Sequence, residues 1–275
     1  FILKTLPIFL IYLVMNDILI KKNNNLFFII LISFLCLIIY LSGERTSFAL
    51  LVLFFFTLFF ILKHLRKIII FIAIIFISFA IILPNLKVSE NPNPAKRMFE
   101  KSYNQILGIG EERYEKHKKK LFSKVYLFSH DHQGHYVLSY RIFKDHKIFG
   151  TGVRGFRYLC RHKIYILENN DGCSTHPHNT YMQILTSNGL VGFSILTFAL
   201  FFIIREIFVC RKRINSSKEI NKYEISKGIA LAAIFINIWP LAPAGNFFNN
   251  WLSIFYFYPI GFYLFFKSVN EKKIS

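Results

Sequence analysis

Long stretches of this chain are apolar, and its polar residues are concentrated between them. A run of about 20 apolar residues is long enough to cross the hydrocarbon core of a bilayer. A single run must form a helix there, because lipid offers no hydrogen-bond partners to its backbone. The pattern therefore predicts an all-α polytopic membrane protein. We expect about seven transmembrane helices, at 3–20, 26–41, 47–62, 68–84, 180–204, 228–244 and 251–266.

One polar stretch, between the fourth and fifth predicted helices, is far longer than the other connections. We therefore expect three parts: transmembrane helices in 1–84, a large loop domain in 85–178, and further transmembrane helices with a cytoplasmic tail in 179–275. A composition of 54% hydrophobic residues with 33 Phe agrees with membrane helices rather than a soluble core. The chain begins with Phe1 rather than Met, so we expect it to be N-terminally incomplete.

Basic residues in the short connections indicate the orientation of the helices. Short loops rich in Lys and Arg stay on the cytoplasmic side, whereas long loops are exempt from this rule. The short connections of one side hold Lys21, Lys22, Lys63, Arg66, Lys67, Arg205, Arg211, Lys212, Arg213, Lys218, Lys222, Lys227, Lys267, Lys272 and Lys273. The large loop is therefore expected outside the cytoplasm.

The net charge of +19 would suggest nucleic acid binding in a soluble protein. Here the cations lie in the cytoplasmic connections and in the large loop, and neither place has an interleaved basic and aromatic pattern. We therefore expect membrane lipid, and no nucleic acid, among the partners.

The short connection at 42–46 opens on the same face as the large loop and reads Ser-Gly-Glu-Arg-Thr. Arg45 is an always-charged, forked donor that matches phosphate oxygens, and Glu44 beside it can orient it. An ionisable residue at membrane level is a functional candidate by default. The alternative is an interfacial anchor whose side chain reaches the bilayer surface.

The loop segment 150–157, GTGVRGFR, matches the spacing of a dinucleotide-binding fingerprint. That fingerprint requires a strand before it and a helix after it within a βαβ unit, which an outer loop does not supply. Its glycines could still let backbone N–H groups approach an anion, with Arg154 and Arg157 adding charge. A plain turn is the other interpretation.

Histidines are concentrated in the same loop. His130, Asp131, His132 and His135, with His176 and His178, carry ligand types that suit zinc. Their spacing follows no established zinc signature, so we expect no metal, and a solvated polar loop is the default interpretation.

The sequence His176-Pro177-His178-Asn179 precedes the fifth predicted helix. Proline keeps the residue before it extended, and Asn179 is a good N-cap for a helix that starts at Thr180. Histidine is the usual general base near neutral pH, so an imidazole here could take a proton from a hydroxyl at the membrane surface. The alternative is that the pair only caps the helix and forms hydrogen bonds.

Two of the four cysteines, Cys160 and Cys173, lie in the large loop. An oxidising compartment would allow them to form a disulfide, and two free thiols are the other option.

Three stretches, in this order, resemble the O-antigen ligase and O-antigen polymerase superfamily of bacterial envelope glycosyltransferases. They read LSGERTSFALLVLFFF, IFGTGVRGFR and HPHNTYMQILTSNGLVGF, and the resemblance spans about residues 40 to 205. Two departures occur. The family has an early loop arginine in a G-R-x-x-x-W-like element, whereas here Gly134 is followed by His135 and the nearest arginine is Arg141. Asn188 stands where an acidic residue is common.

The resemblance implies a metal-independent transfer of a glycan from a polyprenyl diphosphate carrier, without a cofactor. It assigns His178 as the catalytic base and Arg45 to the diphosphate, with Arg141, Arg154 and Arg157 as candidates for a second phosphate contact. Glu44, His135, His176 and Asn179 would support them. In a ligase the acceptor is a sugar hydroxyl of the lipid A core; in a polymerase it is another carrier-linked glycan.

Two other classes of function remain open at this stage. A membrane transporter would have helices broken near the middle of the membrane. The spans 26–41, 47–62 and 68–84 are unbroken and uncharged, whereas 228–244 holds Asn237, Pro240 and Pro243. A receptor or scaffold with a binding loop would leave glycan assembly unaffected when Arg45 is replaced.

Overall fold

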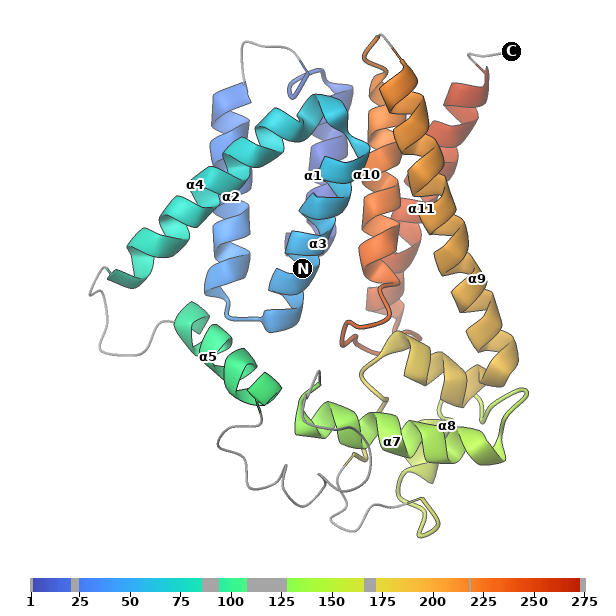
Figure 1. The fold of residues 1–275 in the computed structure, drawn as a ribbon. Coiled ribbons are helices and arrows are strands. Elements are labelled where there is room, and N and C mark those ends of the chain that lie inside the picture. Colours follow the sequence, from blue (N-terminus) through green and yellow to red (C-terminus); the bar gives the residue numbers. More distant parts are fainter. Residues whose placement is uncertain are drawn as a thin grey trace. The chain divides into compact units, whose positions relative to one another are not determined.

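The computed structural model describes residues 2–20, 25–85, 94–107, 128–165, 172–217 and 219–272. Over these residues the chain is helical and forms no strand, which confirms the all-α class. Figure 1 shows the helices. They are α1 (Ile2–Met15), α2 (Asn25–Leu41), α3 (Arg45–Ile61), η1 (Lys63–Leu65), α4 (Arg66–Asn85), α5 (Pro94–Leu107), α7 (His130–Asp145), α8 (Gly155–Leu159), α9 (Thr180–Ser216), α10 (Lys222–Asn237) and α11 (Asn250–Lys272).

Three described helical stretches are long and apolar enough to cross a membrane: Lys63–Ile82, Thr180–Ser216 and Asn250–Glu271. They include the predicted spans 68–84 (to Ile82), 180–204 and 251–266. Helices α1, α2 and α3 are apolar but shorter. A helix of 17 residues, the length of α2 and α3, extends about 25 Å at about 1.5 Å per residue, somewhat less than the hydrocarbon thickness. The count of seven spans stays a prediction.

The predicted span 228–244 differs from the observed helix. Helix α10 ends at Asn237, and residues 238–249 are irregular. Pro240 and Pro243 lack the N–H groups that would continue the helical ladder. The helix begins earlier than predicted, at Lys222, because the Asn221 side chain accepts from the N–H groups of Tyr223 and Glu224.

The described chain forms two compact units that interleave along the sequence. Unit 1 comprises 1–98, 201–238 and 254–275, and unit 2 comprises 99–200 and 239–253. Helices α9 and α11 each contribute to both units, so neither unit is one continuous stretch of chain.

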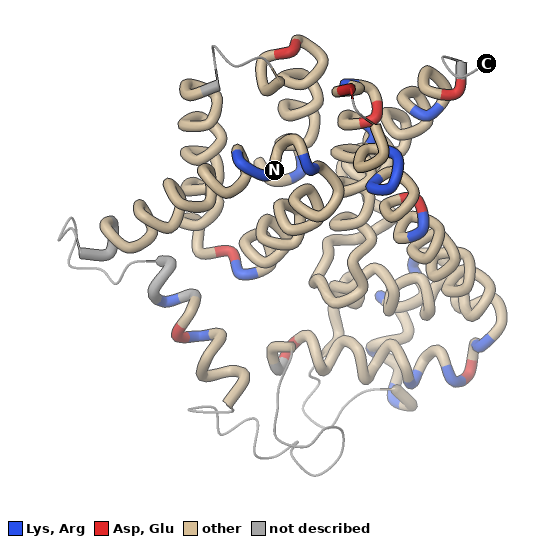
Figure 2. Tube along the Cα trace, turned by 45° about the horizontal axis from the view of Figure 1, so that its top comes forward, with Lys and Arg blue, Asp and Glu red and all other residues tan. Residues whose placement is uncertain are grey.

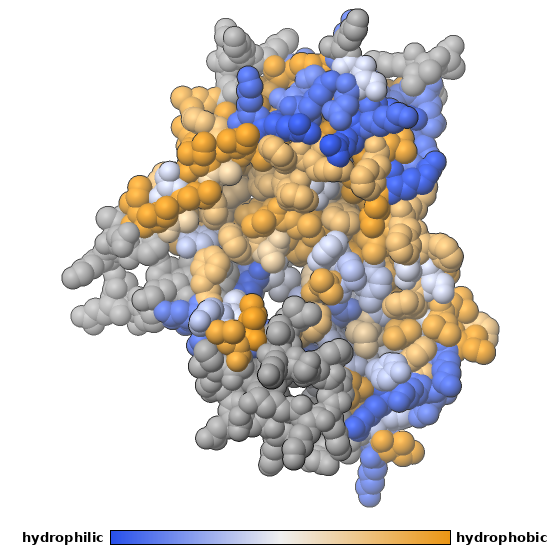
Figure 3. Space-filling model, viewed as in Figure 1, coloured by the Kyte–Doolittle hydropathy of each residue, from blue (hydrophilic) through white to orange (hydrophobic). Residues whose placement is uncertain are grey.

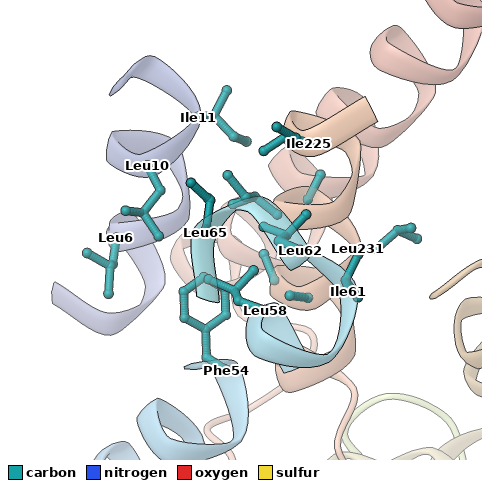
Figure 4. Packing of buried hydrophobic residues seen from close by; sticks show 14 of the residues in the cluster. Leu6, Leu10, Ile11, Phe54, Leu58, Ile61, Leu62, Leu65, Ile225 and Leu231 are labelled. Carbon is teal, nitrogen blue, oxygen red and sulfur yellow. The ribbon is translucent and has the colours of Figure 1, made fainter. Parts of the chain in front are cut away.

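Unit 1 is built around apolar side chains from α1, α3 and α10. Figure 4 shows Leu6 and Leu10 of α1 together with Leu58 of α3 and Ile225 of α10. Outside this core, large apolar residues remain exposed, such as Phe56 of α3 (67%) and Ile81 of α4 (62%). Figure 3 shows apolar residues covering much of the visible surface of these helices. An apolar exposed surface of this extent is expected where lipid is the solvent.

Charged residues of unit 1 occur mainly at helix ends and in connections. Figure 2 shows helix α2 without any Lys, Arg, Asp or Glu, whereas cations occur where α3 passes into α4 and at the end of α9. One exception lies inside α10, where the buried Lys227 forms an ion pair with Glu224 one turn earlier. Among the cations used to predict orientation, Lys21, Lys22, Lys218 and Lys273 lie outside the described residues.

Unit 2 has a small core of its own. Leu138 and Ile142 of α7 pack with Phe156 of α8, Cys160 and Tyr165. Helix α7 begins where the Ser129 side chain accepts from the N–H of His132, a standard N-cap bond. The predicted loop domain 85–178 is described only in part, because 86–93, 108–127 and 166–171 lie outside the described residues.

Candidate functional site

Four histidine rings gather in unit 2. His132 and His135 lie one turn apart on α7, and His176 and His178 lie just before α9. The His178 ring is 4.1 Å from that of His176, 4.9 Å from that of His135 and 5.8 Å from that of His132, measured between centroids. The fold therefore brings together histidines that are about 40 residues apart in the sequence, with His178 in the middle.

His178 has a left-handed backbone, with φ of 55°. Few residues other than glycine adopt this conformation, although histidine is among the more tolerant. The surrounding structure holds it in place, since the His178 carbonyl accepts a hydrogen bond from the Ala244 N–H at 2.8 Å. Strain of this kind is concentrated at functional sites, and it makes His178 a functional candidate on backbone grounds alone.

Asn179 fixes the residue next to His178. Its side-chain oxygen accepts from the Met182 N–H at 3.1 Å, which is the N-cap bond that its position in the sequence predicts. Its amide donates to the carbonyls of Pro240 and Ala242, at 2.8 and 3.3 Å. Asn179 is only 3% exposed, so the cap is also a buried link between the start of α9 and the irregular 238–249 segment.

Gln183 repeats this link one turn further along α9, and the sequence prediction did not assign it a role. Its amide donates to Asn246 Oδ1 at 2.6 Å, and its carbonyl oxygen accepts from the Phe247 N–H at 2.9 Å. The side chain is 3% exposed. The available signal was a polar amide at position i+4 from Asn179, on the same face of the helix.

His135 is anchored on the opposite side of the cluster. Its Nδ1 lies 2.7 Å from the carbonyl oxygen of Gly172. A carbonyl can only accept, so Nδ1 carries the proton, and Nε2 of a neutral His135 is then an acceptor. Gly172 itself has φ of 94° and packs against the backbone of Gly134, where a Cβ would clash. This contact holds the chain before His176 against α7.

The environment keeps the two central imidazoles neutral. Burial, and then the neighbouring His178, lowers the pKa of His176 to about 4. Burial, and then His135, also lowers the pKa of His178. A neutral imidazole has a free nitrogen lone pair, which is the form that a general base needs, although the lowered pKa makes each ring a weaker base.

A disulfide joins Cys160, at the end of α8, to Cys173, three residues before His176. Cys160 is fully buried in the small core of unit 2. The bond therefore connects the segment that carries His176 and His178 to the packed part of the unit.

The predicted phosphate-binding arginines fall in two places. In unit 2, Arg141, Arg154 and Arg157 are exposed, and Arg141 donates to the Tyr165 carbonyl at 3.5 Å. The charge of Arg157 contributes to lowering the pKa of His176, behind burial and the other histidines. In unit 1, Arg45 is the first residue of α3 and the exposed Glu44 is its N-cap residue.

The glycine-rich segment 150–155 proves to be a structural turn. The N–H of Gly150 donates to the His146 carbonyl, that of Thr151 to Thr186 and that of Gly152 to Ser187, at 2.9 to 3.1 Å. Gly155 N–H donates to Gly152. These four N–H groups are therefore used within the unit and are not available to an anion. The two arginines of the segment keep a proposed role.

Among the described residues, no group of three or more His, Cys, Asp or Glu side chains is arranged to hold a metal ion. The His130 side chain lies outside the described residues.

Comparison with protein families identifies a match over much of the chain. The family model described as O-antigen ligase matches residues 27–197, a range that includes Arg45, the glycine-rich turn and the His178 segment. No curated protein and no solved structure matches the chain significantly. Members of this family are enzymes of the membrane glycosyltransferase type. Because the match covers well over half of the chain, the protein belongs to the O-antigen ligase family.

Proposed function

We propose that the protein transfers a glycan from a polyprenyl diphosphate carrier to a sugar hydroxyl of the lipid A core, as an O-antigen ligase on the periplasmic face of the bacterial inner membrane. The observation that carries this proposal is His178. It lies at the start of α9 with a strained backbone, a neutral imidazole and fixed neighbours on both sides. A base of this kind suits the activation of a hydroxyl.

In the proposed reaction, a nitrogen of His178 takes the proton of the acceptor hydroxyl. The acceptor oxygen then forms a bond to the anomeric carbon of the glycan, and the bond from that carbon to the diphosphate oxygen breaks. The bonding electrons leave with the diphosphate, which remains on its polyprenyl carrier. Asn179 and Gln183 act as positioning residues, because they tie the start of α9, directly after His178, to the irregular 238–249 segment.

The leaving diphosphate gains negative charge as the bond breaks, so positive charge near it lowers the barrier. We propose that Arg45, oriented by Glu44, and one or more of Arg141, Arg154 and Arg157 supply that charge. A guanidinium binds phosphate oxygens through paired donors and does not lose its proton. We expect these arginines to remove the need for a metal, so that transfer by the purified enzyme persists in the presence of a chelator.

The test is complementation in a Gram-negative host that lacks its own O-antigen ligase but still makes lipid-linked O-antigen. The parent should restore a lipopolysaccharide ladder on a gel, and His178→Ala and Arg45→Ala should abolish it. Matched controls are His162→Ala and Arg161→Ala, which remove an exposed histidine and an exposed arginine of unit 2. Protein levels in the membrane must be equal across the set. A full ladder with His178→Ala would show that the base is wrongly assigned.

The second candidate is an O-antigen polymerase, which the same family match favours equally. The same variants belong in a polymerase-deficient strain. Restored chain elongation there, with no ligation in the first strain, would change the acceptor from lipid A core to carrier-linked glycan and leave the roles of His178 and Arg45 intact. Activity in neither strain would support the transporter or receptor interpretation instead.

A further inference from the structure

Helix α9 is broken at Gly189, which has φ of 62° and ψ of −156°. A break leaves the first N–H groups of the following helical segment without partners in the helix. Here a turn of unit 2, residues 147–150, supplies them. The Leu190 N–H donates to the Lys147 carbonyl at 2.8 Å, and the Val191 N–H donates to the Ile148 carbonyl at 3.3 Å.

The turn and the break also touch through their glycines. A Cβ on Gly189 would clash with the Ile148 carbonyl group, and a Cβ on Gly150 would clash with the backbone of Ser187 and Asn188. The backbone of the turn is thus in direct contact with the backbone of the helix break, and hydrogen bonds join the two on both sides of the contact. The 147–150 turn is therefore fixed at one level along α9.

At that level the surface becomes apolar. Ile148 and Phe149 in the turn are 61% and 77% exposed. Beyond the break, Ile195 and Phe198 of α9 are 66% and 73% exposed, in a helix that is long and apolar enough to cross a membrane. Ile148 and Phe149 are therefore exposed on the turn that contacts α9 at Gly189, and the exposed residues Ile195 and Phe198 of α9 follow this break.

Cations are frequent in the sequence on both sides of the 147–150 turn. Residues 140–165 hold seven Lys or Arg and only one acidic residue, Asp145, which accepts a hydrogen bond from Tyr165. Lys144 and Lys147 are exposed, and the Lys144 ammonium lies 4.9 Å from the centre of the Tyr140 ring. Figure 3 shows apolar and hydrophilic residues side by side around the C-terminal end of α7. Aromatic and apolar residues flanked by Lys and Arg are typical of segments at a membrane surface.

We propose that the 147–150 turn is an interfacial membrane anchor. Ile148 and Phe149 enter the headgroup region of the leaflet where α9 enters the membrane, and Lys144 and Lys147 contact the phosphate groups of anionic phospholipids. Burying apolar side chains and pairing these cations with anionic headgroups both favour this docking. This inference does not depend on the reaction that the enzyme catalyses.

The test uses the full chain in lipid nanodiscs. Phe149→Cys is labelled with an environment-sensitive fluorophore, because the native thiols of Cys36 and Cys210 are buried and Cys160 and Cys173 form a disulfide. The matched control is Asp131→Cys, an exposed polar position near the start of α7. Lipids with a spin label near the headgroup, or deep in the acyl chain, quench the fluorophore according to its depth.

We expect a blue-shifted emission at position 149 and stronger quenching by the shallow than by the deep spin label, with little quenching at position 131. Phosphatidylglycerol should increase the quenching relative to phosphatidylcholine alone. Lys144→Gln with Lys147→Gln should remove this increase. Equal quenching at 149 and 131 would overturn the anchor. An identical response in the two lipid compositions would overturn the phosphate contact.

Discussion

At the scale of single residues, the candidate site shows how burial controls a proton acceptor. His176 and His178 are close enough that a charge on one disfavours a charge on the other, and both are partly removed from water. Each effect lowers the histidine pKa, so neutrality is a property of the cluster rather than of either ring.

The pKa of His176 leads to a prediction about stability. Its pKa is about 4 in the folded protein and about 6.5 in an unfolded chain, so the unfolded state binds more protons between these values. Above pH 6.5 the ring is neutral in both states and does not affect stability. As the pH falls from 6.5 toward 4, the unfolded chain takes up a proton that the folded protein excludes, so stability is lost. Thermal unfolding of the purified protein should show a falling midpoint across that window.

The variant His176→Gln removes the titrating group but keeps a polar side chain. Its unfolding midpoint should depend less on pH between 6.5 and 4 than that of the parent. If His176→Gln and the parent lose the same stability across the window, the ring does not titrate as the structure implies.

At the scale of elements, a close backbone contact joins α9 to the 147–150 turn of unit 2. Gly150 and Gly152 both have positive φ, but only Gly150 lies against another backbone. An alanine at Gly152 would meet no atom within 4 Å, so it would test the strain of the left-handed backbone alone. An alanine at Gly150 would add a steric clash to that strain.

Gly152→Ala should cost roughly 1–2 kcal/mol, the usual penalty for a left-handed residue with a Cβ. Gly150→Ala should cost clearly more, since the new Cβ would force the turn away from residues 187–189 and break the bonds to Leu190 and Val191. Thermal unfolding in detergent compares the two. Similar losses for both variants would argue against a tight contact between the turn and the helix break.

The disulfide gives a second prediction at this scale. Closing a loop of about 15 residues is worth about 3 kcal/mol in the chain-entropy model, and Cys160 and Cys173 are 13 positions apart. A reductant should therefore lower the unfolding midpoint of the parent and the activity that depends on His178. The double variant Cys160→Ser with Cys173→Ser should start at the lower midpoint and show no further response. A parent that ignores reductant would mean that the bond does not stabilise this segment.

At the scale of the whole molecule, the distribution of cations predicts which ends of the helices face the cytoplasm. Alkaline phosphatase fused after residue 152 should be active, because that enzyme folds only outside the cytoplasm, and a fusion after residue 219 should be inactive. Green fluorescent protein fused at the same two points should give the reverse pattern, because it becomes fluorescent only when it remains in the cytoplasm. Active phosphatase at 219 with none at 152 would invert the predicted orientation.

Much of the fold is readable from local sequence. Apolar runs predicted the helices, and where they failed the cause was specific: the apolar character of 228–244 continues past Asn237, but Pro240 and Pro243 do not allow the helix to follow it. The start of α9 could also be predicted from local sequence, because Asn179 caps the helix by accepting from the N–H of Met182, three residues later.

The sequence alone determined the helical class, the placement of most helices and the histidine and arginine candidates, because periodicity, capping and residue chemistry act over a few positions. Only the tertiary structure decided that His132 and His135 join His178, that Gln183 holds Asn246 and Phe247, and that the glycine-rich segment forms a turn against α9. These arrangements rest on hydrogen bonds and ring contacts between residues far apart in the chain. These interactions stabilise the protein only once the chain has brought those residues together, so the local sequence does not predict which residues will pair.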